Sequence, residues 1–209
     1  MGEYLLIGTG FAFAAAVQPG PLQAYLLSAT MAHGWRRTLP AAFSPLLSDG
    51  PIALLVLLLL RQVPSGFERV MRLAGGALLL YLAVGAFREW RKGEAARTVD
   101  NTAAAPRTLL QAAAVNALNP NPYLGWSLVL GPLVLRAWRS RPANIVALLA
   151  SFYGTMVVML AVTIVLFGTL RTLGPRVARA LLLASAVALV ALSAYQMGSG
   201  LISGYPPPQ

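Results

Sequence analysis

Cysteine is absent from the sequence, and its absence excludes disulfides, thiol redox chemistry and metal sites built on thiolates. The chain has one histidine, His33, and six acidic residues, which are too few for a metal cage made only of protein ligands. Charged residues make up 11% of the chain, about half the fraction that is usual in soluble domains. We therefore expect no cofactor and no resident metal, and we do not expect an enzyme.

Hydrophobic residues are abundant instead: they form 57% of the chain, and the mean hydropathy is +0.68. This composition predicts an all-α integral membrane protein. The net charge is +10, but the basic residues form short clusters between apolar runs, which is typical of cytoplasmic loops. We therefore expect the lipid bilayer, and no nucleic acid, as the partner of the basic residues.

Six apolar segments are separated by charged residues, and we interpret each as a transmembrane helix. The first has 29 residues without a charge, enough to cross a hydrocarbon core of ~30 Å. It lacks a basic N-terminal region and is too long for a signal peptide, so we expect a mature span. The six segments are residues 4–32, 38–60, 73–87 (extended back to about Phe67), 108–135, 142–170 and 180–204.

The connection 88–107 is the longest, and its basic residues and small polar centre predict a flexible loop between two halves, 1–87 and 108–209. The first, third and fifth connections hold ten basic residues, against six in the second and fourth. The positive-inside rule then places the loop 88–107 in the cytoplasm and both termini outside. The location that we expect is a membrane with this loop on its cytoplasmic side.

The first apolar segment is broken in its middle by four residues: Gln18, Pro19, Gly20 and Pro21. The two prolines donate no backbone hydrogen bond, which leaves the carbonyls of Ala15 and Val17 without their usual partners. Lipid cannot satisfy those carbonyls, so the break is expected inside protein or along a polar cavity. A kink with only a packing role is the alternative.

The fourth segment repeats this design, because it is broken by Asn119, Pro120, Asn121 and Pro122. A basic turn follows each break at a similar distance, which predicts two units of three helices with broken helices 1 and 4. Since three is odd, the second unit enters the membrane from the opposite side. Inverted repeats with interrupted helices are a transporter design, in which substrate binds where the breaks face each other.

Asp49 is the only acidic residue well inside a predicted span, with eleven residues on either side of it in the segment 38–60. An aspartate at that depth costs about 2.5–3.5 kcal/mol on insertion scales, so it is expected to face a cavity or a partner. We interpret it as a carboxylate that couples transport to a proton or cation. The alternative is a neutral acid that bonds freed backbone groups.

Amide side chains gather near the two breaks, and they offer either contacts to a polar substrate or partners for the broken backbone. Three aromatic residues, Tyr25, Trp126 and Tyr153, fit either the wall of a cavity or ordinary packing. The amides are Gln18, Gln23, Asn116, Asn119 and Asn121.

Three motifs together resemble those of the LysE-type amino-acid exporters, and the likeness covers essentially the whole chain. They are Pro19-Gly20-Pro21, Ser48-Asp49-Gly50 and Asn116-Ala117-Leu118-Asn119-Pro120. The resemblance implies export of amino acids and related small compounds from the bacterial cytoplasm, driven by ion gradients, and therefore a location in the plasma membrane of a bacterium. The chain departs from the family pattern in Asn-Pro-Asn-Pro and in residues 40–45, close to the expected substrate site, which leaves the cargo open.

The function that we expect is a secondary transporter that exports amino acids or related polar metabolites by proton or cation antiport. Its partners are then a small-molecule substrate and a coupling ion, and a homo-oligomer is left open. A membrane scaffold without transport activity is the alternative, and a metal-ion exporter is less favoured because ligands are scarce. A membrane redox protein is excluded, since it needs paired cysteines.

Overall fold

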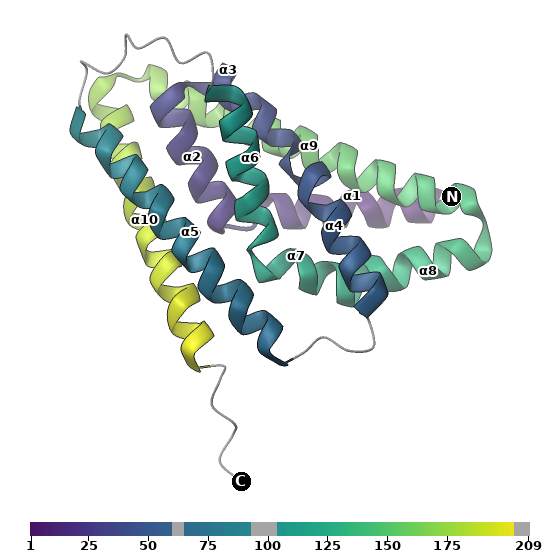
Figure 1. Cartoon of the computed structure of the whole chain (residues 1–209). Coiled ribbons are helices and arrows are strands. Elements are labelled where there is room, and N and C mark those ends of the chain that lie inside the picture. Colours follow the sequence, from purple (N-terminus) through teal and green to yellow (C-terminus); the bar gives the residue numbers. More distant parts are fainter. Residues whose placement is uncertain (60–64, 93–103, 203–209) are drawn as a thin grey trace.

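The computed structural model describes residues 1–59, 65–92 and 104–202, and every regular element in these ranges is helical (Figure 1). The elements are α1 (Gly2–Val17), α2 (Pro21–His33), α3 (Trp35–Thr38), the 3-10 helix η1 (Leu39–Phe43), α4 (Ser44–Leu59), α5 (Ser65–Lys92), α6 (Ala104–Ala117), α7 (Pro120–Gly125), the π-helix η3 (Trp126–Leu130), α8 (Gly131–Ser140), α9 (Pro142–Thr172) and α10 (Pro175–Ile202).

Four of the described helical stretches are long and apolar enough to cross a membrane: Trp35–Val56, Arg72–Arg91, Pro142–Thr172 and Pro175–Leu201. The pair α1 and α2 also passes this test, but the two helices are bent by 63° at the break between them. The described part of the chain therefore has four spans, or five if the bent pair counts as one. The prediction of a multi-pass helical membrane protein is confirmed.

The six predicted segments match the helices unequally. The second, third, fifth and sixth segments correspond to the four long stretches, and the first corresponds to the bent pair. The fourth segment is divided among α6, α7, η3 and α8, none of which is long enough to span alone. The arrangement of six spans in two inverted repeats stays a prediction.

The expected loop 88–107 is helical at both described ends, because α5 continues to Lys92 and α6 begins at Ala104. Its centre, and the chain after residue 202, lie outside the described residues. Arg88, Arg91 and Arg107 therefore stand on helices rather than in a loop.

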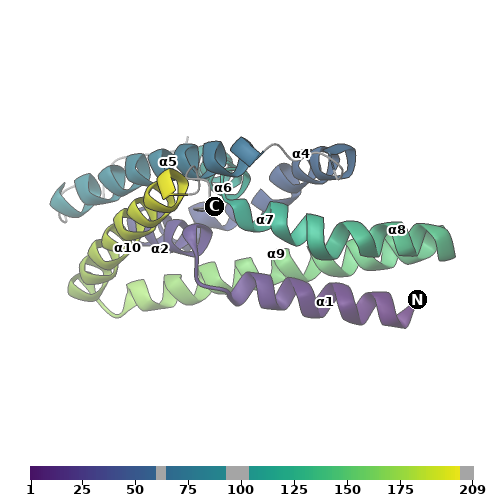
Figure 2. The ribbon, with the colours of Figure 1, turned by 90° about the horizontal axis from the view of Figure 1, so that it is seen from below.

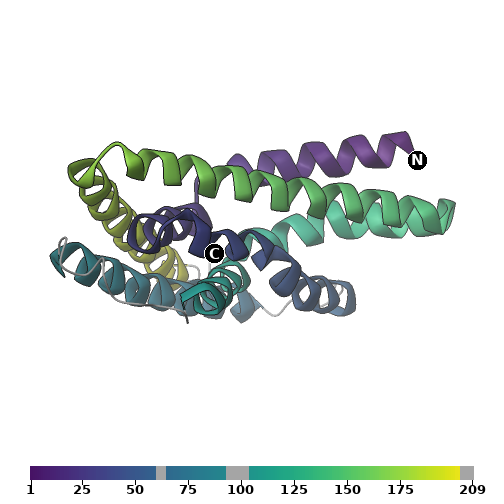
Figure 3. The ribbon, with the colours of Figure 1, turned by 90° about the horizontal axis from the view of Figure 1, so that it is seen from above.

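The helices form two groups that are joined at the two breaks. Figures 2 and 3 show α1, α8 and α9 side by side, while α2, α5, α6 and α10 lie together in the other group. The chain passes from one group to the other at the first break, between α1 and α2, at the second break, between α6 and the stretch α7–α8, and at the turn between α9 and α10. Both breaks therefore lie where the two groups meet.

The main hydrophobic core is centred on helix α9. Phe152, Met156 and Leu160 recur every four residues on one face of α9 and are buried. They pack with residues of α2, α4 and α6 in one hydrophobic cluster. Large apolar side chains such as Leu6 (77% exposed) and Leu128 (73% exposed) point outward, as expected for surfaces that face lipid rather than water.

Glycines allow two of the sharp connections. Gly34, between α2 and α3, has a φ of +86°, and Gly174, between α9 and α10, has a φ of +127°. Other residues rarely adopt these backbone angles, because a Cβ atom would be crowded. The turn at Gly34 directs the chain from α2 towards α4, which carries Asp49.

Candidate substrate site at the two helix breaks

A cavity of about 520 Å³ lies where the two breaks meet α4 and α9. We call it the central cavity. Its volume is within the ~300–1,000 Å³ that is usual for small-molecule sites. Its wall is formed by residues of α1, α2, α4, α7 and α9 and by the ends of the broken helices.

The structure brings most of the predicted site residues together around this cavity. Those that line it are Gln18, Pro19, Gly20, Gln23, Asp49, Asn116, Asn119, Asn121 and Pro122. Pro21 and Pro120 are buried and do not line it. Each of these two prolines is the first residue of a helix, α2 and α7 respectively, where the missing N–H costs nothing.

The first break is closed by a side chain of the following helix. Helix α1 ends at Val17, and Gln18 continues in an extended conformation, as the residue before a proline prefers. The Nε2 group of Gln23 donates a hydrogen bond to the carbonyl oxygen of Ala16 at 2.9 Å. Gln23 therefore replaces the backbone donor that a continuous helix would supply, so this amide serves the broken backbone.

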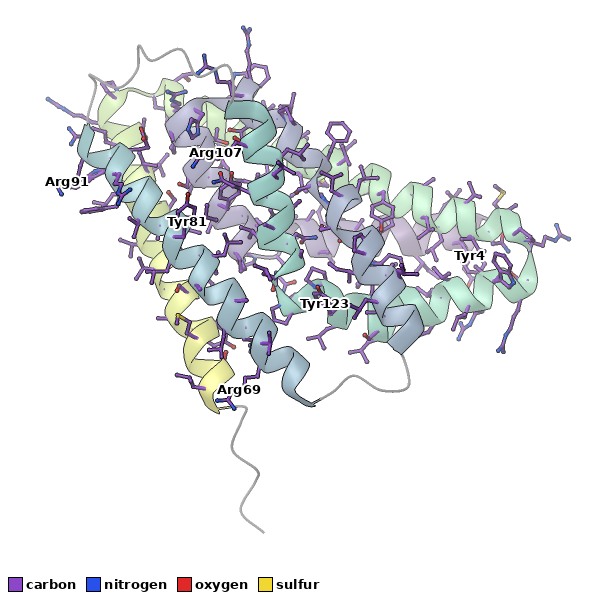
Figure 4. The ribbon with its side chains drawn as sticks, viewed as in Figure 1. Tyr4, Arg69, Tyr81, Arg91, Arg107 and Tyr123 are labelled. Atoms are coloured by element: carbon purple, nitrogen blue, oxygen red, sulfur yellow. The ribbon has the colours of Figure 1, made fainter. Side chains whose placement is uncertain are left out.

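The second break is closed in the same manner. The side-chain oxygen of Asn119 accepts a hydrogen bond from the backbone N–H of Asn121 at 3.2 Å and so caps α7. The hydroxyl of Tyr123 donates to the carbonyl oxygen of Ala117, the last residue of α6, at 2.8 Å. Figure 4 shows Tyr123 below the lower end of α6. Each break thus has one side-chain donor from the helix that follows it.

Asp49 lies on α4 and is only 4% exposed, so its carboxyl group is inside the protein rather than on the outer face. The Nδ2 group of Asn116 lies 2.9 Å from Oδ1 of Asp49 and 2.7 Å from the hydroxyl oxygen of Ser48. Asn116 comes from α6, just before the second break. The hydrogen bonds therefore connect the carboxyl group of the first half of the chain to the broken helix of the second half.

Trp126 adds a donor that sequence analysis did not assign to the site. Its side chain is 4% exposed and lines the central cavity. The indole Nε1–H group lies close to the carboxyl group of Asp49 but does not form a well-aligned hydrogen bond with it. A buried N–H group in this position can bond the carboxyl group or a polar solute in the cavity. Tyr25 and Tyr153, which were considered with it, do not line this cavity.

Sequence analysis also missed the apolar side of the cavity, which is formed by Phe11 of α1 and by Phe152, Met156 and Leu160 of α9. The rings of Phe11 and Phe152 are stacked, with centroids 5.9 Å apart. The spacing of four residues along α9 is a signal that could have identified one face. It could not have shown that this face meets the two breaks.

The charge of the central cavity comes from one carboxyl group. Among the described residues that line it, Asp49 is the only ionisable one, and the other polar groups are amides and the indole N–H. Within the described residues, no three His, Asp or Glu side chains come together as metal ligands. The arrangement is suited to a small polar solute that carries a positive group.

These features define a polytopic helical membrane protein with a polar cavity at two helix breaks, which is the architecture of a transporter. Residues 13–200 match the model of the LysE type translocator family, and the chain belongs to that family. The family is one of transporters, and membership implies a multi-pass membrane protein that transports amino acids or related compounds. Searches of curated proteins and of solved structures gave no match.

Proposed function

We propose that this protein exports amino acids or related small polar metabolites as a secondary antiporter, with the central cavity as the substrate site. The coupling ion in this proposal is a proton that Asp49 holds when substrate is absent. The membrane is a bacterial plasma membrane, with the connection 88–107 on the cytoplasmic side.

One observation carries the proposal: both helix breaks and the buried carboxyl group of Asp49 line a single cavity. Segments that lie far apart in sequence are brought to one place, and each offers polar groups there. Broken helices in a membrane protein are tolerated where they are enclosed by protein or line a cavity. A packing role alone would not require the two breaks to share a cavity with the acid.

The proposed coupling follows from competition for the carboxyl group of Asp49. A substrate ammonium group forms a charge-assisted hydrogen bond with the ionised carboxylate. A protonated carboxyl group loses most of that attraction, so the proton and the ammonium group exclude each other. Substrate that enters from one side releases the proton, and a proton that returns from the other side releases the substrate.

The transport cycle also requires that the central cavity open to each side of the membrane in turn. In this proposal residues 1–87 and 108–209 are inverted repeats that rock against each other around the central cavity. The hydrogen bonds from Asn116 to Ser48 and Asp49 cross from one repeat to the other. These hydrogen bonds would break or lengthen if the repeats moved apart, and they lie beside the carboxyl group for which substrate and proton compete.

The test is efflux from proteoliposomes that contain the purified protein and a mixture of the standard L-amino acids. With an inward proton gradient, we expect wild-type protein to release at least one amino acid faster than protein-free vesicles. Asp49→Asn removes the ionisable group, and we expect it to abolish the stimulation of efflux by the gradient.

Glu3→Gln is the matched control, because it also removes one carboxyl group but at an exposed position near the N-terminus. We expect this variant to behave as wild type. Gradient-stimulated efflux that persists in Asp49→Asn would overturn the coupling role. Failure of the wild-type protein to release any amino acid or related metabolite would overturn the proposal and favour a scaffold function.

A further inference from the structure

A second cavity, of about 420 Å³, lies between α2, α5 and α6. We call it the outer cavity. None of its lining residues is shared with the central cavity. It lies at the ends of α5 and α6 that flank the connection 93–103 in sequence. Its ionisable residues include His33, Arg88, Glu89 and Arg107.

The two cavities lie in series along the pair α2 and α6. Helix α2 lines the central cavity with Gln23 and the outer cavity with residues from Tyr25 to His33. Helix α6 likewise lines the outer cavity with Gln111 and the central cavity with Asn116. Those two α6 positions are about 7.5 Å apart along the helix axis, at 1.5 Å per residue.

Tyr25 lines the outer cavity on α2, two residues after Gln23, which lines the central cavity. Its side chain is 5% exposed, and its hydroxyl lies 3.2 Å from the carbonyl oxygen of Thr108 and 3.0 Å from Oε1 of Gln111. The hydroxyl can donate to either oxygen and so ties α2 to α6. Leu26 and Ala112, next to it on the two helices, are fully buried. Tyr25 and the buried side chains of Leu26 and Ala112 therefore form a closely packed layer between α2 and α6.

The charges of the outer cavity complement both ends of a zwitterion. Arg88 and Arg107 offer guanidinium groups, which bind carboxylates well, while Glu89 offers a carboxylate for an ammonium group. The guanidinium of Arg107 lies 3.4 Å from the hydroxyl of Tyr81 across the gap between α6 and α5. Figure 4 shows Arg107 near the upper end of α6 and Tyr81 lower on α5.

His33 on α2 and Glu89 on α5 are close enough to interact electrostatically. The central cavity differs, because its lining, in the part of the chain that the structure describes, includes no basic side chain. A carboxylate therefore finds charged partners in the outer cavity that the central cavity does not offer.

We propose that the outer cavity is a second binding site, for a small zwitterion of the α-amino-acid class, which holds the solute before it passes Tyr25 into the central cavity. The identity of the ligand rests on the proposed function, but the site itself is defined by its own residues. The guanidinium groups hold the carboxylate, and Glu89 holds the ammonium group.

The absence of cysteine from the chain makes a thiol-protection experiment direct, because the parent protein has no background labelling. Ala32→Cys places one thiol in the outer cavity, and Val84→Cys places one on its opposite wall, on α5. Ala15→Cys reports on the central cavity. Each variant in membrane vesicles is treated with a charged methanethiosulfonate reagent, with and without a mixture of the standard L-amino acids.

We expect L-amino acids to slow the labelling of Ala32→Cys and Val84→Cys. Propionate and ethylamine, which each carry only one of the two charges, should slow it much less. Adding Arg107→Gln to the Ala32→Cys protein should raise the concentration needed for protection about tenfold, since a charge-assisted hydrogen bond is lost. Arg136→Gln, an exposed arginine on α8, is the control and should leave protection unchanged.

The outcomes separate this inference from the proposed function. Amino-acid efflux without protection of either outer-cavity thiol would overturn the second site and leave the exporter proposal standing. Protection of both thiols without any efflux would support the site and overturn export. Equal protection by propionate, ethylamine and amino acids would overturn the zwitterion as ligand.

Discussion

The Nδ2 atom of Asn116 lies 2.9 Å from Oδ1 of Asp49, although the two residues are 67 positions apart in the sequence. This contact joins the buried acid of α4 to the end of α6, immediately before the second helix break. Asn116 also reaches the hydroxyl of Ser48 at 2.7 Å, so one amide group holds two polar neighbours. The position of the carboxyl group in the central cavity therefore depends on a residue of the other half of the chain.

The first prediction concerns this contact. Asn116→Ala leaves the Asp49 carboxyl group and the Ser48 hydroxyl with fewer partners, which costs about 1–3 kcal/mol for a buried polar group. We expect a lower melting temperature in detergent, followed by tryptophan fluorescence, together with a loss of gradient-driven efflux. The second effect follows because the carboxyl group is no longer held in place.

Asn144→Ala is the control for the same change at another site. Asn144 is 8% exposed, as is Asn116, and it donates to Ser140 at 2.9 Å at the start of α9, away from the central cavity. We expect this variant to lose stability but to keep its transport activity per folded molecule. If Asn116→Ala transports as well as Asn144→Ala, the contact with Asp49 has no role in transport.

The second prediction concerns the two side chains that close the helix breaks. Gln23→Met and Tyr123→Phe each keep the size of the side chain but remove the donor to Ala16 or Ala117. An orphaned buried carbonyl costs about 1–3 kcal/mol, and we expect both variants to melt at lower temperature by similar amounts. Tyr195→Phe, at a position that is 68% exposed on α10, should melt as wild type. Melting of Tyr123→Phe at the wild-type temperature would contradict the parallel between the two breaks.

The breaks themselves could be predicted from the sequence, because proline lacks the N–H that a helix interior requires. The burial of Asp49 could be predicted as well, since a charge inside an apolar segment is costly in lipid. Those two arguments are local, and each needs only a few neighbouring residues. These local arguments were enough to select residues that line the central cavity, although they did not show how the segments come together.

The division of the fourth segment among α6, α7, η3 and α8 could not be predicted in the same way. The π-helical turn Trp126–Leu130 carries no proline or glycine within it, and both it and α7 pack against α4, which is distant in sequence. The role of Gln23 was also open, because an amide near a break has several acceptors within reach. Only the folded structure shows that its partner is Ala16.

The outer cavity escaped sequence analysis for a different reason. Arg88 and Arg107 were counted as loop charges that set orientation, which is how basic residues next to apolar segments usually act. Their meeting with His33 and Glu89 depends on the packing of α2 and α6 beside the end of α5. A site that is assembled from three helices cannot be predicted from any one short stretch of sequence.

A third prediction follows from the close approach of α5 to the second break. A Cβ atom at Gly75 would collide with the carbonyl oxygen of Leu118 and with Oε1 of Gln196. Gly75→Ala is therefore expected to cost about 1–3 kcal/mol by overpacking, which would lower the melting temperature. Gly85→Ala is the control on the same helix, since a Cβ atom there meets nothing within 4 Å. It should be neutral, or stabilise by about 0.5–1 kcal/mol because alanine favours a helix.

The last prediction concerns Tyr25, which the solute passes in the proposed route between the two cavities. Tyr25→Phe removes the hydroxyl that lies 3.0 Å from Gln111 and 3.2 Å from the carbonyl oxygen of Thr108, while the apolar ring remains. The tie between α2 and α6 is then weaker by roughly one hydrogen bond, about 0.5–1.5 kcal/mol. We expect the route between the cavities to open more often.

The measurement is the labelling rate of Ala15→Cys, in the central cavity, by a charged thiol reagent added on the side of the outer cavity. Since 1.4 kcal/mol corresponds to a factor of ten, the loss of the hydrogen bond should raise this rate about two- to tenfold. Tyr195→Phe in the same background should leave it unchanged, because that residue is exposed on α10. An unchanged rate in Tyr25→Phe would show that the hydroxyl does not hold the route closed, and the apolar layer of Leu26 and Ala112 would then be the barrier.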